Sequence, residues 1–196
     1  EAFCLPDLVK KAIEAEQSGF DAIIIDCMAD PGLKACREAV SIPVLGAAET
    51  AMYIASLIGH KFSVIAVLDS LRPQFDDLVA LYGLRDKYTS FSSIGVPVLE
   101  LHDDLENVTM LLTQESIKQV QMNNTGAIIL GCTGFIGCAD AIRQGLINKN
   151  LDVPVIDPLP VGVLVADSLV KARLSHSKLT YPTPRVKEIS GYVIPR

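Results

Sequence analysis

Six short apolar runs recur along the chain, and a stretch with helical periodicity separates most of them. The runs are rich in Ile and Val and are apolar at successive positions, which is typical of parallel strands covered on both faces. They cover residues 21–26, 42–46, 61–68, 96–101, 126–131 and 153–157. This alternation predicts an α/β protein with parallel sheets.

Start and stop residues support the helices between these runs. The first helix, over residues 5–18, has Pro6 near its start and Gly19 directly after its end. Further helices are predicted over residues 47–58, 73–82, 107–122 and 159–174. Only two of the six predicted strands precede residue 60, fewer than a compact sheet usually holds. From this unevenness, and from the start at Glu1, we expect a further strand and helix ahead of residue 1.

Composition and charge exclude several classes of protein. A chain of 196 residues that is 49% hydrophobic can bury a core, so a disordered chain or a small disulfide-stapled module is excluded. The net charge of −6 argues against nucleic acid or an anionic membrane as the main partner. No apolar run is long enough for a membrane span, and the first residues lack the pattern of a signal peptide. We therefore expect a cytoplasmic protein whose partner is a small-molecule substrate.

Two of the five cysteines occupy equivalent positions in the pattern. Cys27 and Cys132 each follow a predicted strand directly and precede a Gly-containing turn where a helix should begin. Ligands of open α/β sheets bind outside the carboxyl ends of the strands. Helix N-termini at such a place lower the pKa of a thiol and bind anionic oxygens. The two positions therefore predict one thiol from each half of the chain at a shared site.

The alternative for any cysteine is a buried side chain that acts as a small hydrophobe. We prefer this interpretation for Cys4, Cys36 and Cys138, which lie on helix-like stretches. An odd count without a secretion signal favours free thiols over disulfides, and no Cys-x-x-Cys pair indicates a zinc site. Two opposed thiols suit proton transfer at a stereogenic carbon, because one removes a proton from one face and the other delivers one to the opposite face. This chemistry needs no cofactor if the carbanion is stabilised as an enolate.

Five segments resemble motifs of the hydantoin racemases. In the first, Cys27 and two variable residues precede Asp-Pro-Gly at residues 30–32; in the second, a strand leads into a Gly-x-x-Glu turn that ends at Glu49. The others are Gly-Cys-Thr-Gly at residues 131–134, Pro-Val-Ile-Asp at 154–157 and a tail motif over 180–188. On these motifs the chain is identified as a member of the aspartate/glutamate racemase superfamily, closest to the hydantoin racemase branch, which includes allantoin racemases.

The resemblance implies a fold and a mechanism. It implies two similar lobes, each a parallel four-stranded sheet flanked by helices, with the active site in the cleft between them. Residues 1–59 plus 163–196 would form the first lobe, lacking an N-terminal strand in this chain, and residues 60–162 the second. Cys27 and Cys132 would be the acid/base pair, with no cofactor and no metal. The family's opening strand ends in an Asn-Pro-Asn-type ligand-binding loop that this chain does not contain. We also expect a homo-oligomer.

Four further residues are candidates for substrate binding: Met28, Glu49, Thr133 and Gly134. The first three each have a simpler alternative. The N–H groups of Met28 and Thr133 can bind a substrate oxygen, or they can simply begin a helix. Glu49 can accept a hydrogen bond from a substrate N–H, or it can offset a helix dipole. Gly134 stands where amino-acid racemases have a histidine, which favours the hydantoin branch, whereas Thr133 resembles the amino-acid racemases. Asp30 is interpreted as a helix N-cap rather than a catalyst.

Three functions follow from these observations. The first is a cofactor-independent racemase of 5-substituted hydantoins or allantoin that uses Cys27 and Cys132. The second is an aspartate or glutamate racemase, which would need groups to bind a second carboxylate. The third is a two-lobed binding protein without turnover, in which replacing either cysteine would leave ligand affinity nearly intact.

Overall fold

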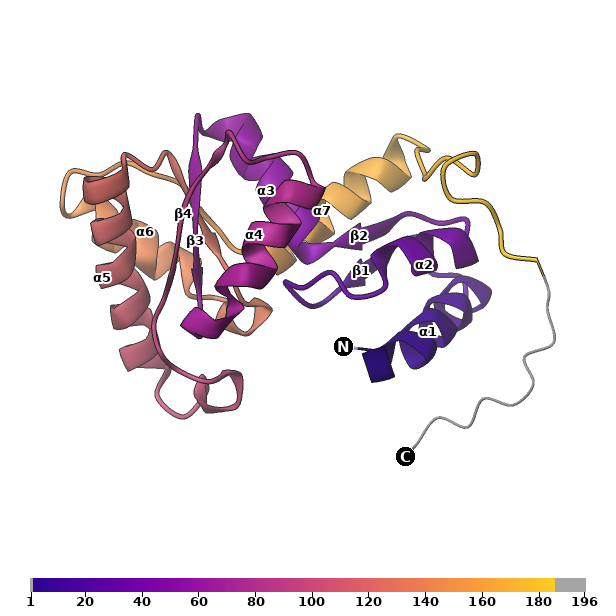
Figure 1. The fold of residues 1–196 in the computed structure, drawn as a ribbon, viewed down its shortest axis with the longest axis horizontal. Coiled ribbons are helices and arrows are strands. Elements are labelled where there is room, and N and C mark those ends of the chain that lie inside the picture. Colours follow the sequence, from indigo (N-terminus) through magenta and orange to yellow (C-terminus); the bar gives the residue numbers. More distant parts are fainter. Residues whose placement is uncertain (1, 186–196) are drawn as a thin grey trace. The chain divides into compact units, whose positions relative to one another are not determined.

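A computed structural model describes residues 2–185, and its contacts divide this part of the chain into two compact units (Figure 1). Unit 1 comprises residues 2–25, 31–45 and 165–185, and unit 2 comprises residues 26–30 and 46–164. The short segment 26–30, which carries Cys27, therefore belongs with the later part of the chain. The lobe boundaries expected from the sequence, at 59/60 and 162/163, stay a prediction.

Unit 1 contains two short strands that pair with each other, together with helices that precede and follow them. Its elements are a 3-10 helix (Ala2–Cys4), α1 (Leu5–Gln17), β1 (Ile23–Ile25), α2 (Leu33–Ala39) and most of β2 (Val44–Gly46). The two strands pair, and the N–H of Ile23 donates to the carbonyl of Pro43 at 2.8 Å. The buried side chains of its core are Ala12, Ile25, Leu33, Cys36, Val40 and Val44. The sheet described in this unit has two strands, where four were implied by the family resemblance.

Unit 2 is built on a four-stranded parallel sheet in the order β4-β3-β5-β6. The strands are β3 (Phe62–Ala66), β4 (Tyr88–Ser93), β5 (Ala127–Leu130) and β6 (Val155–Ile156). The helices are α3 (Ala47–Ile58), α4 (Arg72–Leu81), α5 (Leu105–Asn123), α6 (Ala139–Ile147) and the first half of α7 (Pro158–Lys171). Three short 3-10 helices cover Asp69–Leu71, Val98–Glu100 and Thr133–Phe135.

Alternate residues of β3 face two separate hydrophobic clusters. Phe62, Val64 and Ala66 pack with side chains of α3 and α4, whereas Ile65 and Val67 pack with side chains of α5 and α6. The helices therefore cover both faces of the sheet, as Figure 1 shows for α3 and α4 on one side and α5 on the other. This burial on both faces explains why β3 and β5 read as continuous apolar runs.

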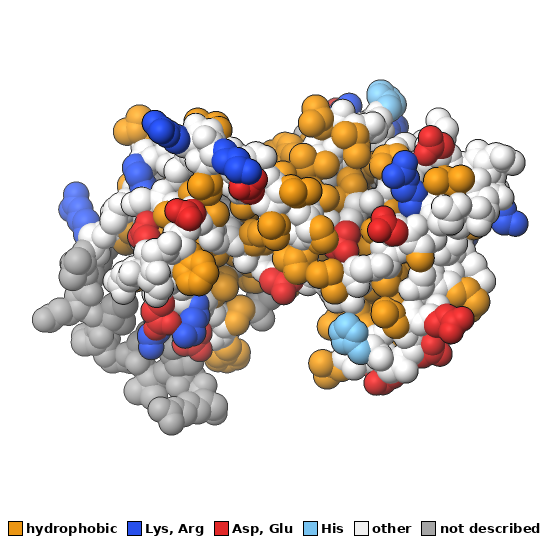
Figure 2. Space-filling model, turned by 180° about the vertical axis from the view of Figure 1, so that it is seen from behind, with side chains coloured by type: hydrophobic (Ala, Val, Ile, Leu, Met, Phe, Trp, Pro, Cys, Tyr) orange, Lys and Arg blue, Asp and Glu red, His pale blue; other side chains and the backbone are white. Residues whose placement is uncertain are grey.

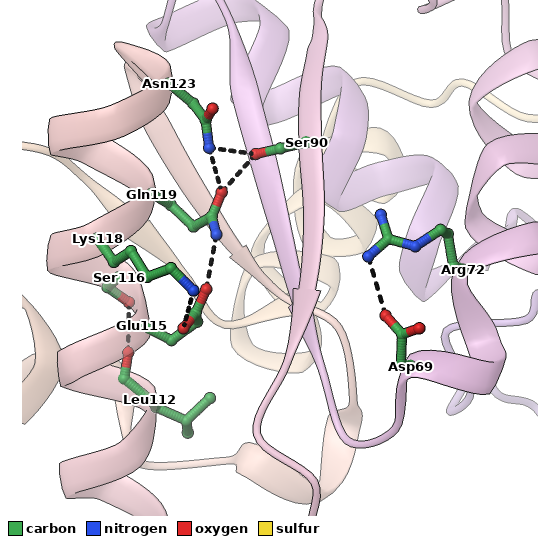
Figure 3. A network of polar contacts seen from close by, with 9 residues as sticks. All are labelled: Asp69, Arg72, Ser90, Leu112, Glu115, Ser116, Lys118, Gln119 and Asn123. Carbon is green, nitrogen blue, oxygen red and sulfur yellow. Dashed lines mark hydrogen bonds and ion pairs between the residues drawn. The ribbon is translucent and has the colours of Figure 1, made fainter.

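The edge strand β4 packs one buried side chain, Phe91, in a hydrophobic cluster and is also held by polar contacts (Figure 3). The hydroxyl of Ser90 donates to Oε1 of Gln119 at 2.5 Å, and Nδ2 of Asn123 donates to the same oxygen at 2.7 Å. Ser90 also shares a hydrogen bond of 2.7 Å with Ser63 on β3. These bonds connect β4 to α5 and to β3, so the strand does not need an apolar sequence.

Five of the six predicted strands are confirmed, and the strand predicted over residues 96–101 is wrong. The fourth strand of unit 2 lies at Tyr88–Ser93, and Val98–Glu100 is a 3-10 helix. Gly95, with a φ of +74°, and Pro97 interrupt an extended chain between these two segments. The predicted helices are confirmed within a few residues at each end. The helix expected after the turn that follows Cys132 begins at Ala139, once a 3-10 helix has ended.

Hydrophobic side chains are also exposed on the surface (Figure 2). On α3 the exposed ones are Tyr53, Leu57 and Ile58, all in its C-terminal half, whereas Ala47 and Ala48 at its start are fully buried. Ala51, Met52 and Ala55 are also fully buried, so one face of α3 packs in the core of unit 2 along most of its length. None of the helices described between residues 2 and 185 is long and apolar enough to cross a membrane.

Candidate active site

Cys27 lies on a tight turn directly after β1. The N–H of Asp30 donates to the carbonyl of Cys27 at 3.0 Å and closes the turn. Asp30 has a φ of +47°, in the left-handed region that few residues other than Gly, Asn and Asp adopt. The thiol of Cys27 is half-buried and is not in a disulfide. The turn thus presents Cys27 at the end of a strand, as its sequence position predicts.

Asp30 connects this turn to the start of α3. Its carboxylate accepts hydrogen bonds from the N–H groups of Ala48 at 2.9 Å and Glu49 at 2.7 Å, and from the hydroxyl of Tyr82 at 2.6 Å. Asp30 is 7% exposed, and this burial raises the pKa of its carboxyl group while the three donors oppose the rise. The prediction that Asp30 is a helix N-cap is wrong, because the N-cap residues are Gly32 for α2 and Gly46 for α3. The side chain of Asp30 instead binds the first turn of α3 from a distant position in the sequence.

Cys132 lies at the carboxyl end of β5, next to the centre of the sheet. It is extended, with a φ of −150°, and it is the N-cap of the 3-10 helix Thr133–Phe135. Its sulfur accepts a hydrogen bond from the N–H of Gly134 at 3.4 Å. A Cβ on Gly134 would lie 2.9 Å from Cδ1 of the buried Leu101 and 3.4 Å from this sulfur. Glycine therefore keeps the side of the Cys132 thiol clear.

The electrostatics of Cys132 connect the two cysteines. The lowered thiol pKa expected from the sequence position is wrong for Cys132: burial is the main cause that raises its pKa, and the N–H of Gly134 only partly opposes the rise. The charges of Cys27 and Asp26 raise the pKa further. The charge of Cys27 is thus one of those that act on the Cys132 thiol. Both belong to unit 2.

The other predicted residues surround these two turns in different ways. Met28 is 4% exposed, and its side chain packs in the core with the alanines of α3, so its N–H is the group that the prediction concerns. Thr133 and Gly134 are half-buried in the 3-10 turn after Cys132. Glu49 lies in the first turn of α3, and its charge contributes to the raised pKa of Asp30. The substrate contacts expected of these residues stay predictions.

The sequence did not point to Tyr82 or Leu101. Tyr82 follows the last residue of α4 and contacts Asp30 across 52 positions of sequence, while Leu101 follows a 3-10 helix and packs beside Gly134. No local pattern marks either residue, because each contact depends on the tertiary fold. Of the tail motif, Lys187 and Glu188 lie outside the described residues.

The chemistry available at these turns is that of thiols and backbone N–H groups. Among the described residues there is no group of three His, Cys, Asp or Glu side chains placed to hold a metal ion. A thiol with a raised pKa is protonated at neutral pH and can donate a proton, and its thiolate can remove one. The two thiols can therefore act as an acid and a base.

Comparisons with known proteins find similar sequences and structures. The family model described as Asp/Glu/Hydantoin racemase matches residues 1–166. The chain is 36% identical to a hydantoin racemase of Pseudomonas sp. (strain NS671) over 192 residues, which cover 97% of this chain and 75% of that protein. The structure resembles an allantoin racemase from Klebsiella pneumoniae with a TM-score of 0.87 and 30% identity, over 94% of this chain and 74% of that one. It also resembles an allantoin racemase from Pseudomonas fluorescens with a TM-score of 0.81 and 31% identity, over 93% and 79% of the two chains.

Proposed function

Because the chain belongs to the Asp/Glu/hydantoin racemase family, in its hydantoin racemase branch, and is therefore a racemase, we propose that it racemises 5-substituted hydantoins or allantoin with Cys27 and Cys132 as its acid/base pair. The observation that carries the proposal is that Cys27 and Cys132 each lie on a turn directly after a strand, β1 and β5, and that both belong to unit 2. The charge of Cys27, which is among the causes that raise the pKa of Cys132, supports it. The identity with hydantoin racemases and the likeness to allantoin racemases support the choice of substrate class.

In the proposed reaction, one proton is removed from C5 of the substrate ring and another proton is added to the opposite face of C5. The thiolate of one cysteine removes the C5 proton, and the electron pair of the broken C–H bond moves onto the neighbouring carbonyl as an enolate. The thiol of the other cysteine then gives its proton to the opposite face of the same carbon. One thiolate and one thiol are consumed, and one of each is formed, so no cofactor is required. The two cysteines exchange roles for the opposite enantiomer.

The backbone of the two turns offers donors for the enolate oxygen. The N–H groups of Met28 and Thr133 each follow a cysteine, and the one at Thr133 begins a 3-10 helix. Donors that are already oriented toward developing negative charge stabilise a transition state without reorganisation. In this proposal Glu49 accepts a hydrogen bond from a ring or ureide N–H of the substrate. A cytoplasmic location and a homo-oligomeric state complete the proposal and stay predictions.

A second substrate class has one specific observation in its favour. Thr133 gives the second cysteine motif a Gly-Cys-Thr start, which resembles the amino-acid racemases, although Gly134 departs from their motif. Aspartate and glutamate are therefore the second pair of substrates to test. A binding protein without turnover is set aside, because the family is one of racemases.

The test follows optical rotation and deuterium incorporation together. One pure enantiomer of a 5-alkyl hydantoin, and separately of allantoin, is incubated in D₂O with the wild-type protein, Cys27→Ser and Cys132→Ser. We expect the wild type to bring the rotation to zero with deuterium at C5, and each variant to racemise about 10²- to 10⁴-fold more slowly. Each variant should at most exchange deuterium into one enantiomer without inverting it, since it keeps only one thiol.

The control is Cys4→Ser, which should racemise at the wild-type rate. Cys4 is exposed, so its predicted burial is wrong, whereas Cys36 and Cys138 are buried as predicted. Racemisation at the wild-type rate by Cys27→Ser or Cys132→Ser would contradict the two-thiol mechanism. If the wild type acts only on aspartate or glutamate, the mechanism stands and the substrate class is wrong.

A further inference from the structure

We infer that Asp30 is a positioning residue for the reaction: its carboxylate fixes the Cys27 turn to the N-terminus of α3 and so sets the position of the Cys27 thiol. This inference rests on the proposed function, since the position of the thiol matters for turnover only if the thiol reacts. Asp30 itself has no access to a substrate, because it is 7% exposed and its oxygens are already bonded.

The carboxylate is bonded from two separate elements. Ala48 and Glu49 donate from the first turn of α3, where backbone N–H groups have no partner within the helix. Tyr82 donates its hydroxyl from the end of α4. Charge-assisted bonds to a buried carboxylate are stronger than neutral ones, and the positive end of the α3 dipole adds to them. The turn is therefore attached at its last residue to two helices of the unit 2 core.

The backbone around Asp30 is shaped to allow these bonds. The N–H of Asp30 closes the turn onto the carbonyl of Cys27 at 3.0 Å, so the carboxylate and the thiol are attached to the first and last residues of one hydrogen-bonded backbone turn. Asp30 adopts a left-handed φ of +47°, which costs energy in a non-glycine residue. A Cβ on Gly46 would overlap the carboxylate, so the glycine before α3 leaves the space that Asp30 fills.

These features indicate that Asp30 does more than cap a helix, because it also attaches the Cys27 turn to unit 2. A cap of α3 could come from the residue preceding the helix, as Asp104 caps α5 by accepting from the N–H of Asn107 at 3.0 Å. Here the cap comes from 18 residues earlier and brings the segment 26–30 into unit 2. The side chain of Met28, which packs in the core of unit 2, is a second attachment of this segment.

The experiment compares Asp30→Asn and Tyr82→Phe with the control Asp104→Asn. Asp30→Asn keeps the shape of the side chain but replaces one acceptor oxygen with an NH₂ group, which cannot accept from the N–H and O–H donors around it. Tyr82→Phe removes the hydroxyl donor and leaves the bonds from Ala48 and Glu49 in place. Asp104→Asn changes a helix cap in the same unit that has no bond to either cysteine turn. For each protein we would measure kcat and KM for racemisation, the melting temperature, and the rates at which iodoacetamide alkylates Cys27 and Cys132, resolved by peptide mass spectrometry.

We expect Asp30→Asn to lower kcat by about 10- to 100-fold with a much smaller change in KM, because a misplaced reacting group slows the chemical step. Alkylation of Cys27 should change at least about threefold while that of Cys132 stays constant, as expected if orientation alone is lost. Tyr82→Phe should show the same changes in smaller measure, and Asp104→Asn none of them.

The alkylation rates decide this inference even if the protein racemises none of the substrates. A selective change at Cys27 in Asp30→Asn would support the positioning role while the proposed function fails. If Cys27 in Asp30→Asn is alkylated at the same rate as in the wild type, the positioning role of Asp30 is overturned. A fall in kcat that Asp104→Asn matches at the same loss of melting temperature would also overturn it, because the effect would then follow stability alone.

Discussion

The Cys132 thiol has the most specific environment of the residues at the site. Burial raises its pKa, and the nearby charge of Cys27 raises it further. We predict that alkylation of Cys132 by iodoacetamide, followed against pH, has a midpoint above the ordinary thiol pKa of 9.0. In Cys27→Ser the midpoint should fall, because removing a neighbouring negative charge makes the thiolate easier to form.

Asp104→Asn is the control for this titration, since it changes a distant helix cap and should leave the midpoint where it is. Asp26→Asn should lower the midpoint as Cys27→Ser does, because Asp26 also raises the pKa of Cys132. An equal midpoint in the wild type and in Cys27→Ser would mean that the two thiols do not interact, and the acid/base pair would lose its main support.

At the scale of single elements, the short helix α2 depends on a side chain from the far end of the chain. Nζ of Lys178 donates to the carbonyls of Arg37 at 2.9 Å, Glu38 at 3.1 Å and Val40 at 2.6 Å, at the C-terminal end of α2. An ammonium group there satisfies free carbonyls and offsets the helix dipole. We predict that Lys178→Met lowers the free energy of unfolding by about 1–3 kcal/mol, measured by urea denaturation.

Lys171→Met is the matched control for Lys178→Met. Lys171 belongs to the same unit and forms an exposed pair with Asp167 at 2.7 Å on α7, an interaction that contributes little to stability. The prediction fails if both variants unfold at the same urea concentration as the wild type.

The elements show which parts of the fold a sequence can predict. Strands buried on both faces, such as β3 and β5, are continuous apolar runs, and the cysteine turns follow from them. The edge strand β4 has the sequence Tyr-Thr-Ser-Phe-Ser-Ser, which has no continuous apolar run, because Phe91 is its one buried side chain and Ser90 bonds to Gln119 and Asn123 of α5. The cap of α3 by Asp30 was also beyond local reasoning, since only the folded chain brings residues 30 and 48 together.

At the scale of the whole molecule, the hydrophobic core is divided unequally between the two units. Unit 1 has a two-stranded sheet and one small cluster, whereas the sheet of unit 2 has four strands between two larger clusters. Two-stranded sheets are marginally stable, and regions with few buried apolar contacts open most easily. Cys27 follows β1 of unit 1 by two residues, so opening of β1 would release one end of its turn while Asp30 holds the other.

We therefore predict that unit 1 opens before unit 2, and two amides provide a matched test. The N–H of Ile23 donates to Pro43 at 2.8 Å in unit 1, and that of Ile128 donates to Pro154 at 2.9 Å in unit 2. By native-state hydrogen exchange, Ile23 should exchange at least about tenfold faster than Ile128 after correction for intrinsic rates, with a smaller dependence on denaturant. Equal exchange free energies would mean that the whole chain opens in one step. In that case Asp30 could not hold the Cys27 turn while β1 is open, and its effect on turnover would have to arise within the closed protein.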